Sequence, residues 1–166
     1  MHSPTTDFRH TLRALIEAKV DFILVGGVAA VMQGAPINTY DLDLVHARDE
    51  QNIHRLLPVL ESMDAVFRMQ PERRLRPNQS TLAGRGHLNL RTSVGHVDLL
   101  CTIGKDLTYE DLLPFTKEME LDAGMKFRVL GLEKLIELKE ELGRDKDRAV
   151  LHILRHTLEE SRKSGR

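Results

Sequence analysis

The stretch from Thr39 to Val45 alternates polar and apolar residues, and two of its polar residues are Asp41 and Asp43. Successive side chains of a strand point to opposite faces, so Thr39, Asp41 and Asp43 are expected on one face, with the residues between them facing the core. Two neighbouring carboxylates repel each other and are disfavoured in strands, so they call for a compensating cation. Carboxylate oxygens suit Mg²⁺. The pattern therefore predicts a sheet with a metal site on one face.

Two further features accompany this strand. Upstream, the apolar run from Phe22 to Val25 ends at Gly26-Gly27, and helix-forming residues follow, which predicts a strand, a glycine turn and a helix. Downstream, Asp98 is the only Asp, Glu, Lys or Arg between Arg91 and Lys105, and it lies in an apolar run. We expect this third acid to lie with the first two.

A two-residue hairpin turn at Ser93-Val94 fixes which residues are opposite each other on the strands around Asp98. The predicted pairs are Leu90 with Val97, Leu88 with Leu99, Asn89 with Asp98 and Arg91 with His96. The apolar pairs share one face and the polar pairs share the other. A shift of one residue would mix the faces. We interpret His96 as a structural hydrogen-bonding residue, not as a catalytic one.

The remaining periodicity predicts an α+β fold, in which a mixed sheet is backed by helices. Further strands are expected at 115–121 and 126–130. Helices are expected from Phe8, capped by Thr5 or Thr6, at 49–63, and in two C-terminal segments at 132–142 and 145–160. Residues 71–86 contain two prolines, two glycines and four arginines and are interpreted as a mobile basic loop. We expect one domain over residues 1–160 and a flexible tail over 161–166.

Composition excludes several classes of protein. The formal charge of −1 and the pI near 6.7 argue against the broad basic surface of strong nucleic-acid binders, so any RNA contact must come from a local patch. The only cysteine, Cys101, lies in an apolar run, which excludes a disulfide framework and fits a reducing cytoplasm. No apolar run approaches the roughly 20 residues of a membrane span, and the start lacks the pattern of a signal peptide.

Together these residues resemble the DNA polymerase beta type nucleotidyltransferase superfamily. Its signature is an apolar residue, Gly, then Gly or Ser, a spacer, Asp-x-Asp and a distant third carboxylate. The matching residues are Leu24-Val-Gly-Gly27, Asp41-Leu-Asp43 and Asp98. Within the superfamily the chain looks most like the compact bacterial branch with AbiEii-type toxins, whose late Lys and Arg-x-Lys-Asp cluster are matched by Lys139 and Arg144-Asp-Lys-Asp147. Ile37 stands where toxins of this branch often have an arginine.

The resemblance implies a nucleotidyltransferase that uses an NTP, with Mg²⁺ as cofactor and Asp41, Asp43 and Asp98 as metal ligands and catalytic residues. In that chemistry two Mg²⁺ ions support in-line attack of an acceptor hydroxyl on the α-phosphate, and pyrophosphate leaves. The candidate nucleotide-binding residues are Gly26, Gly27, Thr39, Lys139, Arg144 and Lys146. The acceptor is left open among RNA, protein and a small molecule, and an antitoxin is a further expected partner.

Two alternatives belong to other classes. The first is a nucleotidyltransferase fold kept as a binding or regulatory module, with a toxin and antitoxin pair as one setting, although the three carboxylates are intact. The second is a DxD-dependent glycosyltransferase, which this chain is too short to be and which would not explain the upstream Gly-Gly. Lys139 gives independent support to the leading hypothesis, because helical periodicity puts it inside an apolar stripe, where a lysine is unusual. A phosphate partner would explain it, although snorkelling to solvent is the simpler alternative.

Overall fold

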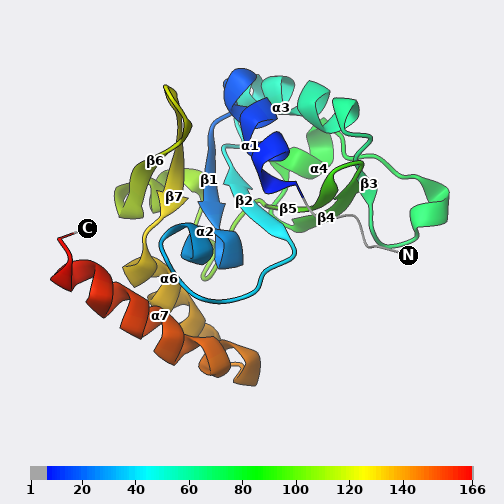
Figure 1. The fold of residues 1–166 in the computed structure, drawn as a ribbon. Coiled ribbons are helices and arrows are strands. Elements are labelled where there is room, and N and C mark those ends of the chain that lie inside the picture. The colour runs from blue at the N-terminus through cyan, green and yellow to red at the C-terminus, as the bar shows by residue number, and fades with distance from the viewer. Residues whose placement is uncertain (1–6, 166) are drawn as a thin grey trace, which may run out of the picture.

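A mixed β-sheet runs through the computed structural model, which describes residues 7–165 (Figure 1). Within these residues the sheet has seven strands in the order β3-β4-β5-β2-β1-β7-β6. Their bounds are β1 Phe22–Val25, β2 Leu42–His46, β3 Val66–Phe67, β4 His87–Thr92, β5 Gly95–Leu100, β6 Thr116–Asp122 and β7 Met125–Leu130. Strand β2 runs antiparallel to β1 and parallel to β5, and β1 runs parallel to β7, so the sheet is mixed. The α+β prediction is confirmed.

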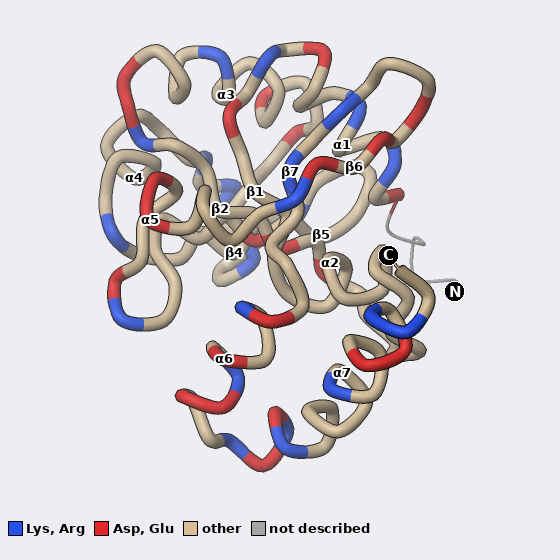
Figure 2. The backbone as a smooth tube through the Cα atoms, turned by 90° about the vertical axis from the view of Figure 1, so that its left-hand side faces the viewer, with Lys and Arg blue, Asp and Glu red and all other residues tan. Residues whose placement is uncertain are grey.

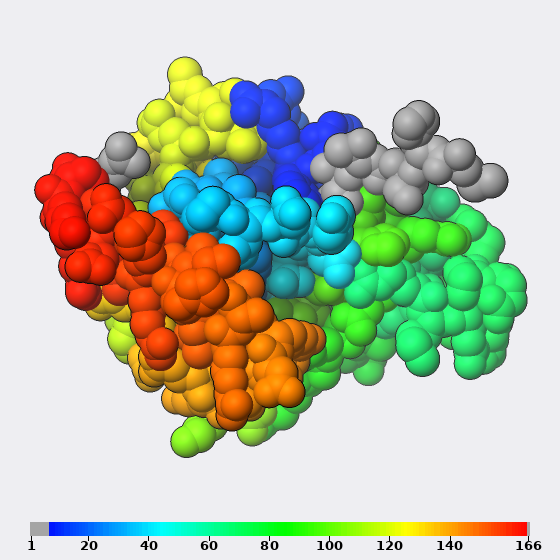
Figure 3. Space-filling view, turned by 60° about the horizontal axis from the view of Figure 1, so that its bottom comes forward, coloured from blue at the N-terminus to red at the C-terminus, as the bar shows by residue number. Residues whose placement is uncertain are grey.

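Helices flank the sheet on both sides. Their bounds are α1 Phe8–Glu17, α2 Gly26–Met32, α3 Glu50–Ser62, α4 Gln79–Ala83, α5 Tyr109–Leu112, α6 Leu132–Leu142 and α7 Asp145–Lys163. Figure 1 shows α1 and α3 together at one end of the molecule and the C-terminal pair α6 and α7 at the other. Figure 3 shows α7 lying against the segment that precedes β2, where Gly34 approaches Thr157. In the described part of the chain, none of these helices is both long and apolar enough to cross a bilayer.

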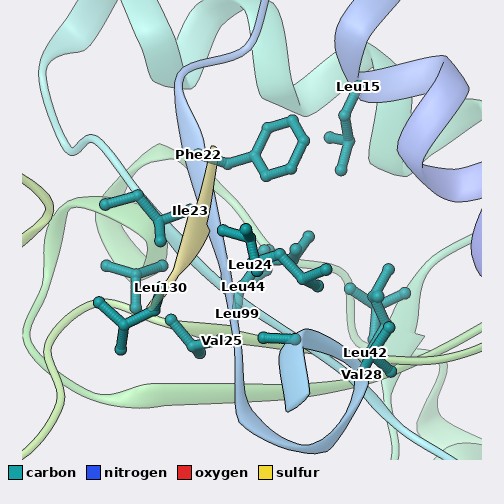
Figure 4. Packing of buried hydrophobic residues seen from close by; sticks show 14 of the residues in the cluster. Leu15, Phe22, Ile23, Leu24, Val25, Val28, Leu42, Leu44, Leu99 and Leu130 are labelled. Atoms are coloured by element: carbon teal, nitrogen blue, oxygen red, sulfur yellow. The ribbon is translucent and has the colours of Figure 1, made fainter. Parts of the chain in front are cut away.

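The core lies where the central strands meet α1 and α2 (Figure 4). All four residues of β1 are buried, because β1 has a strand on each side and helices over its faces. Leu42 and Leu44 of β2 and Leu99 of β5 are at most 1% exposed. Each such side chain stabilises the fold by about 1.5–3 kcal/mol relative to its exposed state. The alternation of β2 therefore directs its leucines inward and Asp43 to the other face.

The hairpin of β4 and β5 confirms the register predicted from Ser93-Val94. Leu90 is opposite Val97, and Asn89 is opposite Asp98. The exposure of β4 alternates residue by residue along the whole strand, as expected for a strand with one face on the core. The predicted hairpin near residues 115–130 is confirmed as β6 and β7.

Several boundaries differ from the predictions. Asp7 caps α1 by accepting a hydrogen bond from the backbone N–H of His10, whereas Thr5 and Thr6 lie outside the described residues. Strand β2 begins at Leu42, so Thr39 and Asp41 lie on the approach to the strand and not within it. Helix α7 ends at Lys163, three residues beyond the predicted end at 160, and Arg162 in its last turn pairs with Glu133.

The segment interpreted as a mobile basic loop contains regular structure. A 3-10 turn spans Pro71–Arg73, and α4 begins after Asn78, which forms a reciprocal capping box with Thr81. Arg74 and Arg76 both pair with Asp64. These short-range polar contacts order a stretch that has no hydrophobic period.

Candidate active site

Asp43 and Asp98 lie opposite each other on neighbouring strands. Strands β2 and β5 are parallel, and their register pairs Asp43 with Asp98. On the other side of Asp98, β4 places Asn89 opposite it, as predicted. Asp98 is only 9% exposed. Strand pairing thus brings two acids that are far apart in the sequence onto one half-buried spot of the sheet.

Burial and mutual repulsion dominate the electrostatics of this pair. Burial, followed by the carboxylates of Asp98 and Asp41, raises the pKa of Asp43 to about 7 against the opposing effect of Arg68. Burial also raises the pKa of Asp98, against the lowering effect of Arg68. Near neutral pH, Asp43 is therefore partly protonated and hydrogen-bonded to Asp98. A bound cation would favour the charged form of both groups.

Asp41 lies beside the pair but is held differently. Its side chain is 42% exposed, and its Oδ1 atom is 3.3 Å from His96 Nδ1 and 3.8 Å from Arg68 Nη1. The guanidinium of Arg68 also donates from Nη2 to Asp98 Oδ1 at 2.6 Å. Arg68 therefore bridges two of the three predicted metal ligands.

Gly26 and Gly27 pack directly against two of the predicted site residues. Gly26 has a φ of +68°, and a Cβ there would overlap Asp43 Oδ2. A Cβ on Gly27 would lie 2.7 Å from Thr39 Oγ1. The resemblance made both glycines candidate nucleotide-binding residues. The structure adds that each leaves room for a side chain of this site, which any larger residue would displace.

Lys139 and Arg144 are joined by a buried carboxylate. Asp147, in the first turn of α7, is 1% exposed and accepts hydrogen bonds from Lys139 Nζ at 3.3 Å and from Arg144 Nε at 2.5 Å. The hydrogen bond from Arg144 has the larger effect, and together the two bonds lower the pKa of Asp147, so its carboxylate stays charged. The ammonium group of Lys139 is therefore hydrogen-bonded to Asp147 and does not simply extend into solvent. Figure 2 shows both signs of charge alternating through the turn between α6 and α7.

A cleft of about 670 Å³ joins these two groups. Gly26 and Asp43 line it on the sheet side, and Lys139 and Arg144 line it on the side of α6. Part of the remaining wall is apolar: Val25, Leu100, Ile103, Leu135, Leu138 and Leu142. The polar side chains of Arg85, His87, Thr102 and Asp106 also line it. Lys146 is exposed and is absent from the described residues that line this cleft. The cleft thus holds the carboxylates of Asp43 and Asp106 and the cations of Arg85, Lys139 and Arg144.

The donor set fits a divalent cation. Within residues 7–165, no three His, Cys, Asp or Glu side chains gather closely enough to form a ready-made metal cage. However, Asp43 and Asp98 are adjacent carboxylates, which are hard oxygen ligands, and burial together with the neighbouring acids raises the pKa of Asp43. Asp41 is turned towards Arg68 and His96. The coordination of one metal site by all three acids therefore stays a prediction.

Sequence reasoning missed Arg68. It follows β3, a strand of only two residues, which is too short to give a periodic signal. The backbone N–H of Arg68 donates to Asn89 O at 2.9 Å and continues the pairing of β3 with β4. One signal could have found it. Asp43, Asp98 and Asn89 share the polar face of the sheet, and their acids favour a positive residue on the strand beside β4.

Comparisons with known proteins agree on the fold. No family model matches the chain, and no curated protein matches it in sequence. Three solved structures match over most of the chain. A protein of Thermotoga maritima classed as a nucleotidyltransferase has a TM-score of 0.55 at 18% identity, over 91% of this chain and 94% of its own. The lincosamide antibiotic adenylyltransferase LnuA, in its lincomycin-bound structure, has a TM-score of 0.58 at 13% identity, over 92% and 98%.

The third is an antigenic nucleotidyltransferase-like protein of Paracoccidioides brasiliensis, with a TM-score of 0.54 at 16% identity, over 92% of this chain and 74% of its own. At these identities the likeness concerns the fold and not the substrates. The chain therefore has the fold of the nucleotidyltransferases, as the glycine pair and the three aspartates predicted.

Proposed function

We propose that this chain is a metal-dependent nucleotidyltransferase, which transfers a nucleoside monophosphate from an NTP to an acceptor hydroxyl. The observation that carries the proposal is the shared cleft: Asp43, beside Asp98, faces the same space as Lys139 and Arg144. Acids that hold a cation and bases that bind phosphate are the two requirements of this chemistry. The nucleotidyltransferase fold of the solved neighbours is consistent with it.

The residues have separate tasks in the proposed reaction. Mg²⁺, when bound by Asp43, Asp98 and Asp41, would lower the pKa of the acceptor hydroxyl and balance the charge of the triphosphate. Lys139 and Arg144 bind and orient the phosphates by charge-assisted hydrogen bonds. The acceptor hydroxyl gives up its proton to solvent, its oxygen forms a bond to the α-phosphorus, the bond from that phosphorus to the bridging oxygen breaks, and pyrophosphate leaves.

Other residues prepare this arrangement. Asp147 positions Lys139 and Arg144, because its buried carboxylate contacts both. Gly26 and Gly27 leave room for the side chains of Asp43 and Thr39, because neither residue has a Cβ in the way. The buried Leu135 and Leu138 lower the local dielectric on one wall of the cleft, which strengthens the contacts between phosphates and cations.

The AbiEii-type branch is the finer part of the proposal. It is supported by Lys139 and the Arg144-to-Asp147 cluster, which are in contact with each other. If the chain is a toxin of this kind, its expression arrests growth, whereas the Asp43→Asn variant does not. A small-molecule acceptor stands beside RNA and protein, because LnuA is an antibiotic adenylyltransferase of the same fold.

The proposal is tested with NTPs labelled at either the α- or the γ-phosphate. Each is incubated with the protein, Mg²⁺ and fractions of RNA, protein and small molecules from cells, with EDTA as the control. We expect label from the α-phosphate in one fraction and none from the γ-phosphate. Label from the γ-phosphate would mean phosphoryl transfer, and label from neither position would reject a transferase.

A binding or regulatory module is the second candidate. It is favoured by one observation, the bridge that Arg68 makes between Asp41 and Asp98, which occupies ligands that catalysis requires. In this case the protein binds NTP in a titration, but no label moves in the presence of any fraction.

A further inference from the structure

Arg68 is built into the carboxylate site from the neighbouring strand. Its backbone is fixed by the bond from its N–H to Asn89 O, and only 23% of its side chain is exposed. Nη2 donates to Asp98 Oδ1 at 2.6 Å. Nη1 forms an ion pair with Asp41 Oδ1 at 3.8 Å, which is beyond hydrogen-bond distance, and this buried nitrogen has no hydrogen-bond partner in the part of the chain that the structure describes. The guanidinium is therefore hydrogen-bonded to an acid at the Asp98 end only.

The charges at this site are unbalanced. Three carboxylates, those of Asp41, Asp43 and Asp98, face a single guanidinium. Burial of a guanidinium with an unsatisfied N–H destabilises the fold, unless the cation relieves a larger unfavourable interaction. Here that interaction is the repulsion among the three acids. Arg68 thus supplies part of the positive charge that the site requires, and it does so through Asp98 Oδ1, an oxygen of a predicted metal ligand.

We propose that Arg68 is an internal counter-ion that holds Asp98 in the metal-free protein and releases it when a divalent cation binds. This inference rests on the proposed function, because it takes the acids to be metal ligands. The exchange needs only rotation of the side chain, since the backbone stays bound to Asn89. Release of Arg68 also removes the longer of the two contacts of Asp41 Oδ1 and leaves the contact with His96 Nδ1 at 3.3 Å.

The first test is a calorimetric titration with Mg²⁺ of the wild type and of Arg68→Gln. The matched control is Arg91→Gln. Arg91 lies on β4, two residues from Asn89 and on the same face of the strand, and it is exposed opposite His96. It carries the same positive charge as Arg68. We expect Arg68→Gln to bind Mg²⁺ at least about tenfold more tightly, the scale of one charge-assisted hydrogen bond that need not be broken. Arg91→Gln should stay within about twofold of the wild type, since only screened charge is lost.

Tighter binding alone would also follow if Arg68 repelled the metal without moving. The second measurement therefore follows the guanidinium protons of Arg68 by NMR, identified by their loss in Arg68→Gln. We expect slow exchange with water in EDTA and faster exchange with Mg²⁺, because the bond to Asp98 is lost. If the guanidinium protons stay protected from water at saturating Mg²⁺, the proposal that the metal displaces Arg68 from Asp98 is wrong.

The outcomes separate this inference from the proposed function. A wild type that binds no Mg²⁺ rejects both. A wild type that binds Mg²⁺ with an affinity that Arg68→Gln does not improve rejects only the role of Arg68. If Arg68→Gln does not fold in EDTA, Arg68→Lys replaces it in the titration, because lysine keeps the charge but cannot present two nitrogens. We then expect Mg²⁺ affinity above that of the wild type, and an equal or lower affinity contradicts the proposal.

Discussion

The carboxyl groups of Asp43 and Asp98 face each other across the parallel strands β2 and β5, and Asp43 has a pKa of about 7. The register of the sheet fixes this contact. The two acids cannot separate without a shift of β5 by a whole pair of residues, which would also move Val97 and Leu99 along the core. The fold therefore maintains a repulsive pair, and the stability of the protein should depend on it.

The first prediction concerns the pH dependence of stability without metal. The pKa of Asp43 rises from 3.8 to about 7 on folding, so the folded state binds this proton more tightly. The bound proton stabilises the folded state fully below pH 3.8, and this stabilisation is lost as the pH rises to about 7. Asp43→Asn has no such proton to lose. In EDTA, the melting temperature of the variant should therefore rise relative to that of the wild type across this pH range.

The comparison between the two proteins is needed because other groups also titrate. Burial lowers the pKa of His46, so its charging destabilises the fold at low pH in both proteins. That effect cancels in the difference. A difference between wild type and Asp43→Asn that is constant with pH would mean that the proton is not on Asp43.

The second prediction concerns the glycine pair. Gly27→Ala places a Cβ 2.7 Å from Thr39 Oγ1, so we expect it to lower the free energy of unfolding by about 1–3 kcal/mol, as overpacking does. Thr39→Gly removes the clashing atoms. In a double-mutant cycle by urea unfolding, Gly27→Ala should cost less in the Thr39→Gly background than in the wild type. Equal costs in both backgrounds would mean that the glycine serves another purpose.

The third prediction separates Lys139 from Lys146, which are both candidate nucleotide-binding residues. Lys139 lines the cleft, so Lys139→Met should weaken binding of a nonhydrolysable NTP by about 1.5–3 kcal/mol. Lys146 is exposed outside the cleft lining, and Lys146→Met should change affinity little. Calorimetric titration of the two variants measures this. Equal effects would point to a general charge effect and not to a contact by Lys139.

Lys139→Met should also lower the melting temperature slightly. The helical stripe alone suggested that stability would be unchanged, because the methylene stem still packs. The structure adds the bond from Lys139 Nζ to Asp147, which the variant loses. Arg144 keeps Asp147 paired, so the loss stays small.

The fourth prediction concerns the two acids in the first turn of α7. Asp147 is buried and bonded to Lys139 and Arg144, whereas Asp145 is exposed. Asp147→Asn should lower the free energy of unfolding by about 1.5–3 kcal/mol, the range for a hydrogen bond to a charged group. Asp145→Asn should stay within about 0.5 kcal/mol, as for most surface changes. Similar losses in both would assign the effect to the helix dipole.

Local signals were sufficient for much of this structure. The turn at Ser93-Val94 set the register of β4 and β5, and this register alone placed Asn89 next to Asp98. The glycine pair and the alternation at Asp43 located the ends of β1 and the strand β2. In each case a short-range rule of backbone geometry decided the outcome, so no tertiary information was needed.

The remaining features depend on contacts between distant segments. Arg68 enters the site only because β3 pairs with β4, and two residues give no period from which to predict a strand. Asp41 lies before the first residue of β2, and its contacts with Arg68 and His96 come from segments distant in the sequence. Lys139 was recognised as unusual, but its partner Asp147 lies on the next helix, and the sequence had no means to pair them.

The most direct test of the central claim is the rate of α-phosphate label transfer by Asp43→Asn at saturating Mg²⁺, compared with the wild type. Asparagine keeps the shape of the side chain but loses the negative charge of the proposed ligand. With the fold intact by circular dichroism, we expect the rate to fall by more than about a hundredfold, since even outer contacts of metal sites are worth ten- to a hundredfold. An unchanged rate would contradict a catalytic metal at Asp43 and Asp98.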